Sequence, residues 1–339
     1  MASHPNTRPA WIERPGRSWP GLALAGILGL AAACDRQPTL ELGKTVLGQD
    51  TTWTGTVVLA GDVEIPPGIT LTIAPGTTVR FRKIDEKSDQ NLYVPDSPYY
   101  PQAELIVRGR LLAEGQPGQA IVFTSAAADA QPADWGAINF LGSAGSVIRH
   151  AKILCAYNGV HAHGSQLRIE DSEFVKNGVA ISFKREEETP GVPWFGRDSD
   201  LVIAGNLITR NKGGITGRNA RAEIAHNEIR DNKFFGIWPK EDSPMFIHHN
   251  EITGSKKGLY LYQARGLRVE SNNIYDNTDY DIGVAEAQDY PVDARGNWLG
   301  TTDPARIAER IFDHADDPEL AEILALPALT APVAWEKKR

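Results

Sequence analysis

Aromatic and cationic residues occupy matching places in successive segments of this 339-residue chain. Trp238 and Lys240 stand at alternate positions of one segment, and Tyr260 and Tyr262 stand at the same positions of the next. Aromatic rings can pack on the C–H faces of sugars, while lysine and arginine pair with carboxylates. The pattern therefore predicts a surface that binds an anionic sugar chain.

When the earlier segments are aligned on their apolar residues, further polar and charged residues fall on the same predicted surface. It adds two cations and two histidines, and an insertion at residues 184–200 adds a tryptophan at the edge of the same face. The predicted ligand-binding residues are His161, His163, Lys184, Trp194, Arg218, Trp238, Lys240, Tyr260 and Tyr262. The alternative is that these are ordinary surface residues of strands, since β-propensity alone favours Tyr, Trp and other bulky side chains there.

Catalytic residues stay unassigned, and whether the protein is an enzyme is left open. A glycosidase needs two positioned carboxylates, and the predicted surface has no acidic pair in successive segments. His161 and His163 could serve as a base pair or as two metal ligands, but a zinc site needs a third ligand. We predict no metal site and no cofactor; Ca²⁺ would suit a lyase, but no motif supports it.

Short repeats must position these residues. An asparagine recurs at steps of 21, 23, 22 and 25 residues, at Asn206, Asn227, Asn250, Asn272 and Asn297. Apolar and polar residues alternate between these positions, as in half-buried strands, and a second Asn followed by Gly marks another turn in most repeats. A period near 22 residues predicts stacked coils of short strands, with the asparagines forming ladders at the corners.

The repeats resemble the right-handed parallel β-helix, or pectin-lyase-like, family over about Trp53–Leu299. The stretches Val63–Val79 and Leu105–Gly115 resemble its opening coils, and the repeats from Leu167 onward resemble its general repeat. The resemblance implies an all-β solenoid with strands paired from coil to coil around a core of Ile, Val and Leu. It also implies that a polysaccharide lies across the stacked strands, as in the family's lyases, although fold does not determine function.

The N-terminus has the features of an export signal. Arginines precede the 13-residue apolar run Gly21–Ala33, which is short for a membrane span, and Ala31–Cys34 resembles a bacterial lipobox. We predict a lipoprotein signal peptide at residues 1–33 and lipidation of Cys34, which would anchor the protein to the lipid bilayer of the bacterial cell envelope, at a periplasmic or outer-membrane face. The alternative is a plain secretory signal.

The sequence also predicts where the domain begins and ends, and its charge limits the kinds of partner. We predict a linker at residues 34–52 and one β-helix domain at residues 53–299. A C-terminal cap and tail follow at residues 300–339, with a short helix within Thr302–Phe312 and a second candidate helix at Asp317–Leu324. With 43 acidic and 35 basic residues the chain carries a formal charge of −8, which argues against a general nucleic-acid binder. A monomer is expected.

Three functions fit these observations. The first is an envelope-anchored lipoprotein that binds, or binds and modifies, an acidic polysaccharide along its exposed sheet. The alternative is a non-catalytic structural or assembly scaffold that docks another envelope protein. The second alternative is a polysaccharide lyase, hydrolase or epimerase, which would need an acid–base set that the sequence alone does not supply.

Overall fold

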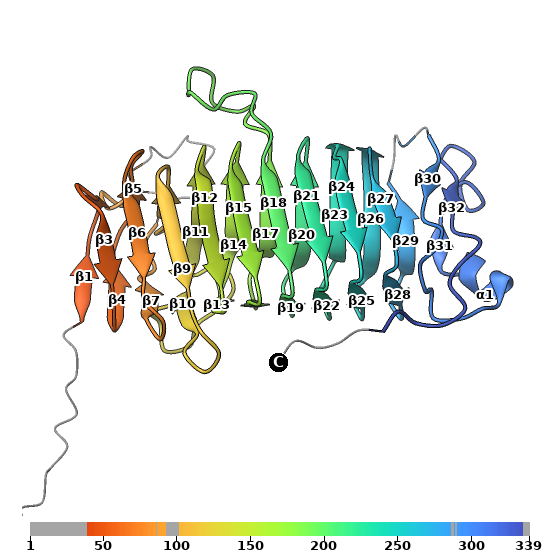
Figure 1. Ribbon diagram of the computed structural model, residues 1–339, viewed down its shortest axis with the longest axis horizontal. Helices are drawn as coiled ribbons and strands as arrows, with labels where there is room; N and C mark the ends of the chain where they lie inside the picture. Colours follow the sequence, from red (N-terminus) through yellow and green to blue (C-terminus); the bar gives the residue numbers. More distant parts are fainter. Residues whose placement is uncertain (1–38, 86, 93–101, 286–287, 289, 335–339) are drawn as a thin grey trace, which may run out of the picture. The chain divides into compact units, whose positions relative to one another are not determined.

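The computed structural model describes residues 39–85, 87–92, 102–285, 288 and 290–334. Within the unit Gln37–Arg339, the chain winds into coils that contribute strands to three parallel sheets, here named A, B and C. Figure 1 shows the coils stacked side by side from β1 to the C-terminal cap. Cys34 and the predicted signal peptide lie outside the described residues. Within the described part of the chain, no helix is long and apolar enough to cross a membrane.

Each sheet takes one strand from nearly every coil. Sheet A contains β1 (Leu40–Leu42), β4 (Thr56–Leu59), β7 (Thr78–Phe81), β10 (Ile121–Ser125), β13 (Ala151–Leu154), β16 (Glu173–Val175), β19 (Leu207–Thr209), β22 (Glu228–Arg230), β25 (Glu251–Thr253) and β28 (Asn273–Tyr275). Sheet B contains β2 (Thr45–Val46), β5 (Val63–Ile65), β8 (Leu105–Val107), β11 (Trp135–Leu141), β14 (Ala156–His163), β17 (Val179–Lys184), β20 (Gly213–Arg218), β23 (Phe235–Asp242), β26 (Lys257–Arg265), β29 (Tyr280–Val284) and β31 (Ile311–Phe312). Sheet C contains β3 (Thr51–Trp53), β6 (Thr70–Ile73), β9 (Arg110–Glu114), β12 (Ala144–Arg149), β15 (Gln166–Glu170), β18 (Asp200–Ala204), β21 (Arg221–Ala225), β24 (Met245–His248) and β27 (Arg268–Glu270). The predicted all-β solenoid is confirmed.

The core is built from apolar residues that repeat in register. In sheet A, the completely buried Ile208, Ile229, Ile252 and Ile274 pair with one another in that order. Burial of a side chain of this size stabilises a fold by roughly 1.5–3 kcal/mol. Because side chains on a strand alternate between its two faces, the same register fixes which residues point outward.

Two asparagine ladders hold the corners of the coils, as the repeats predict. Asn227 Oδ1 accepts hydrogen bonds from the backbone N–H and the amide of Asn206, at 3.0 and 2.9 Å, and Asn250 does the same for Asn227. The residue before each ladder asparagine is left-handed, for example His226 at φ 57° and His249 at φ 53°. These bends leave backbone groups unpaired within the coil, and the asparagine amides satisfy them.

Both ends of the solenoid differ in detail from the sequence prediction. Pairing starts at β1, so strands already form inside the predicted linker at residues 34–52. At the other end, the helix predicted within Thr302–Phe312 is α1 (Pro304–Ala308), which begins after Asp303, whose side chain accepts a hydrogen bond from Ala305 N. The second helix predicted at Asp317–Leu324 is wrong, because that segment holds turns and β32 (Ile323–Leu324), which pairs with β30 (Val292–Asp293).

Candidate functional site

The outward columns of sheet B lie in the register that the repeats predict. One column runs through His161, Ser182, Thr216 and Trp238, on β14, β17, β20 and β23. A second column, two residues further along each strand, runs through His163, Lys184, Arg218, Lys240 and Tyr262. The two histidines are buried, whereas the later members of both columns are half-buried. The columns therefore divide into a covered end and an open end.

The open end borders a groove of about 650 Å³, whose lining also includes the first residues of β14 and β17. Five aromatic residues line it, namely Tyr157, Phe234, Phe235, Trp238 and Tyr260, together with the lysines Lys212, Lys240, Lys256 and Lys257. None of the described residues that line the groove is acidic. On a chain with a formal charge of −8, this is a local concentration of positive charge over apolar rings.

An aromatic row extends from the groove along the stack of coils. The ring centres of Trp238 and Tyr260 lie 5.2 Å apart, those of Tyr260 and Tyr280 lie 6.4 Å apart, and those of Tyr280 and Phe312 lie 5.4 Å apart. The four residues belong to consecutive strands of sheet B, from β23 to β31. The row thus offers a linear series of ring surfaces rather than a single pocket.

Two of the lysines lie directly against these rings. Lys240 Nζ is 3.5 Å from the ring centre of Trp238, and Lys257 Nζ is 3.8 Å from that of Tyr260. Burial, and then the positive charge of Arg218, lower the pKa of Lys240 below its ordinary value. Burial also lowers the pKa of Lys257; the nearby Asp279 carboxylate opposes this effect and the positive charge of Lys256 adds to it. Crowded cations of this kind gain stability when an anion binds beside them.

The other two predicted cations are paired with the insertion. Lys184 Nζ forms an ion pair with Glu188, and Arg218 lies 3.5 Å from Glu187. Their charges are therefore largely offset by carboxylates from the same chain. In the structure these pairs connect the insertion to the sheet. Among the groove lysines, Lys256 is itself paired with Asp279 at 3.5 Å.

His163 lies at the centre of a buried polar chain. Its Nδ1 is 3.0 Å from Glu186 Oε2, and its Nε2 is 3.1 Å from His161 Nε2. Burial alone would raise the pKa of Glu186, but the hydrogen bonds from His163 and from the N–H groups of Glu188 and Thr189 outweigh it and lower the pKa to about 2. Burial, together with His163 and Lys184, lowers the pKa of His161 well below its ordinary value, so His161 is neutral. A small pocket of about 210 Å³ lies beside His161.

Trp194 lies away from the open groove. It is buried against Ile106 and Leu141, and the Arg108 guanidinium carbon is 5.2 Å from its ring centre. The insertion therefore folds back towards β8 and β11, where Trp194 fastens it. The neighbouring Phe195 is 49% exposed.

The described residues contain one group whose side chains fit together as metal ligands, and it is not the predicted histidine pair. It consists of His226, His248 and His249, at the corner between sheets C and A. In contrast, His163 uses its two ring nitrogens for Glu186 and His161.

Sequence reasoning missed much of the groove. Lys212, Lys256 and Lys257 follow the corner positions Asn211 and Ser255, and the alignment considered only the positions after the next glycine. The recurrence of lysine after these corner residues is a signal that was present in the repeats. Tyr157 lacked such a signal, because its place beside the groove depends on how β11 and β14 pair.

Residues 158–299 match the family described as the right handed beta helix region. No curated protein sequence matches the chain. Similar solved structures include the periplasmic alginate epimerase AlgG, with 14% identity and a TM-score of 0.35 over 82% of this chain and 74% of that chain. They also include the Dettilon tailspike protein gp208, with 14% identity and a TM-score of 0.36 over 84% of this chain and 60% of that chain. The family match and the parallel pairing of the strands identify residues 158–299 as a right-handed parallel β-helix.

Proposed function

We propose that the groove on sheet B binds an acidic polysaccharide. The observation that supports this is the lining of the groove, with five aromatic residues, four lysines and no carboxylate among its described residues. Aromatic rings provide flat apolar surfaces for sugar rings, and the lysines provide charge for carboxylates. A neutral polymer would use the rings but gain nothing from lysines such as Lys240 and Lys257, which lie directly against them.

The shape of the surface suits a chain molecule. The aromatic row from Trp238 to Phe312 follows the direction in which the coils stack, with ring centres 5.2 to 6.4 Å apart. A linear polymer lying along this row would contact several strands of sheet B at once. Many weak contacts along one polymer chain would then add up, because each 1.4 kcal/mol of binding free energy lowers Kd tenfold.

Matched substitutions on two faces test this proposal. Trp238→Ala and Lys257→Ala should each weaken binding of a polyuronate about tenfold, since a partly desolvated contact of this kind is worth about 1–2 kcal/mol. Phe246→Ala and Arg268→Ala are the controls, because they remove a similar ring and cation, 4.3 Å apart, from sheet C. If the sheet B and sheet C substitutions weaken polyuronate binding equally, or if neither pair changes it, the groove has no role in binding.

The cellular setting is a separate part of the proposal. The Arg-containing leader, the apolar run and Cys34 support an exported protein with a lipid anchor in the bacterial cell envelope. The alternative scaffold function predicts a flat apolar docking face, whereas the groove is hollowed and carries four lysines beside its apolar rings. An envelope protein partner that competes with the polysaccharide for the groove would favour the scaffold function.

A second candidate function, chemical modification of the bound polymer, rests on the buried polar chain. His161 is neutral and borders a small pocket that Lys184, Arg218 and Lys240 also line. A neutral imidazole can accept a proton, and the charge of Lys240, which does not pair with the insertion, would stabilise the negative charge that develops on a uronate when it loses one. His161→Gln should then abolish turnover of a polyuronate and leave its binding unchanged. Absence of turnover by the unaltered protein on a panel of polyuronates would remove this candidate.

A further inference from the structure

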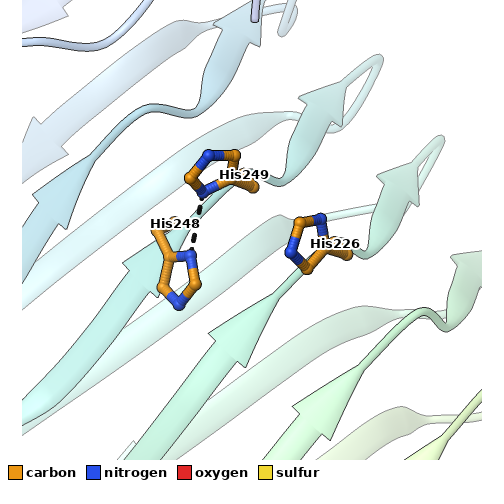
Figure 2. A group of neighbouring side chains, drawn as sticks. All are labelled: His226, His248 and His249. Atoms are coloured by element: carbon orange, nitrogen blue, oxygen red, sulfur yellow. Dashed lines mark hydrogen bonds between the residues drawn. The ribbon is translucent and has the colours of Figure 1, made fainter. Parts of the chain in front are cut away.

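Three histidines converge at the corner between sheets C and A of the solenoid. Figure 2 shows His248 at the end of its strand, His249 directly after it, and His226 on the preceding coil facing the pair. One ligand nitrogen from each residue lies within 4.8 Å of the others. We propose that His226, His248 and His249 bind a first-row transition-metal ion such as Zn²⁺, with the remaining coordination positions open to solvent.

The repeat brings these residues together. His226 and His249 both occupy the left-handed position before a ladder asparagine, Asn227 or Asn250, so they are corner neighbours in successive coils. His248 is the last residue of β24 and pairs with Ala225, whose small side chain leaves space above the sheet. The three imidazoles thus project from two ladder corners and a strand end rather than from a long loop.

The distances suit tetrahedral coordination after small side-chain rotations. His248 Nδ1 and His249 Nδ1 are 2.9 Å apart, while two nitrogens on one tetrahedral Zn²⁺ at 2.0–2.1 Å stand about 3.3 Å apart. The ring centre of His226 is 5.2 Å from that of His249, and His226 is exposed, so its ring can turn towards the pair. Imidazole nitrogens suit zinc, copper and nickel, and do not suit calcium or magnesium.

The orientation of His248 favours metal binding over a fortuitous contact. Its ring stacks on Phe246 with the centres 3.9 Å apart, and its Nε2 lies 3.4 Å from Glu223 Oε1. The carboxylate at this distance favours a proton on Nε2, and that tautomer leaves the Nδ1 lone pair directed at His249. Metal-binding histidines in proteins are commonly oriented by a carboxylate in this way.

Calorimetric titration of the full-length, untagged chain with Zn²⁺ tests the proposal. We expect one ion per chain, with affinity more than about 100-fold lower in His248→Ala and His226→Ala, and about tenfold lower in Glu223→Gln, which removes the orienting charge. The matched control is His150→Ala, since His150 occupies the same left-handed corner position in an earlier coil, where Asp171 follows at the next corner. Circular dichroism checks that each variant is folded.

A measurement on the unaltered protein makes the test independent of the variants. Bound Cu²⁺ should show magnetic coupling to the nitrogens of three imidazoles in pulsed electron paramagnetic resonance. Absence of Zn²⁺ binding, equal binding by His226→Ala and the parent, or coupling to a single imidazole would overturn the proposal. The groove on sheet B does not depend on this outcome.

Discussion

Replacement of Asn250 by alanine should be among the most damaging single changes at a corner of the solenoid. The side chain is 1% exposed. Its Oδ1 accepts hydrogen bonds from Asn227 N and Nδ2, and its Nδ2 donates to the carbonyls of Ile224 and His248 and to Asn272 Oδ1. Alanine would leave at least the buried N–H of Asn227 and the carbonyl of Ile224 without these partners. Each buried group left unsatisfied costs about 1–3 kcal/mol, so the free energy of unfolding should fall by about 3–5 kcal/mol.

The second ladder provides a graded version of this experiment. There Ser255 stands at the asparagine position and accepts a hydrogen bond from Asn232 N at 3.2 Å. Asn250→Ser should therefore retain part of the ladder and destabilise the protein less than Asn250→Ala. Arg221→Ala, at a side chain that is 61% exposed, is the control and should change stability by no more than about 0.5 kcal/mol.

Urea unfolding followed by circular dichroism would measure these differences, and amide hydrogen exchange would locate them. Because a solenoid can open in parts, the exchange of amides near Asn227 should increase before that of amides in β4 or β7. A loss below about 1 kcal/mol for Asn250→Ala, or equal losses for alanine and serine, would refute the view that the ladder satisfies buried backbone groups.

Three other predictions concern the insertion, pH and anchoring. Trp194→Ala should expose the insertion to proteolysis, with a loss of about 3 kcal/mol of packing energy, whereas Phe195→Ala, at a 49% exposed side chain, should not, as limited proteolysis would show. Burial raises the pKa of Asp62 from 3.8 to about 6 and that of Glu104 well above its ordinary value. The folded protein thus holds these protons more tightly than the unfolded chain does. Its free energy of unfolding, measured in urea, should therefore decrease as pH rises from about 4 through 6 and beyond. In Glu104→Gln this decrease should be less steep above pH 6. Cys34→Ser should move the protein from the membrane fraction to the soluble periplasmic extract, and unchanged membrane retention would contradict lipid anchoring through this residue.

The repeats made the outward columns predictable. The asparagine ladders mark two of the corners of most coils and so fix where the strands start. Because a strand alternates its faces, the alignment of Ile215, Ile237 and Leu259 determines the places of Trp238 and Lys240. The structure confirms this register. The same reasoning could have found the histidine cluster, because His226 and His249 both precede ladder asparagines.

The insertion could not be predicted in this way, because its contacts do not follow the repeat. Glu186 turns inward to His163, and Trp194 packs on Ile106 and Leu141, which are separated from it by more than 50 residues. Such contacts depend on the path of one irregular loop rather than on a period. For this reason the predicted cations Lys184 and Arg218 were placed on an open surface, whereas the structure pairs them with insertion carboxylates.

The most direct test of the proposed function compares one polymer in two chemical states. The soluble form that starts at Asp35 would be titrated with a polyuronate and with the same polymer after reduction of its carboxyl groups to alcohols. Because the four groove lysines face no carboxylate among the groove's described residues, the acidic polymer should bind, and binding should weaken with added salt. The reduced polymer should bind at least about tenfold more weakly. Equal binding of the two polymers, or binding of neither, would contradict the account.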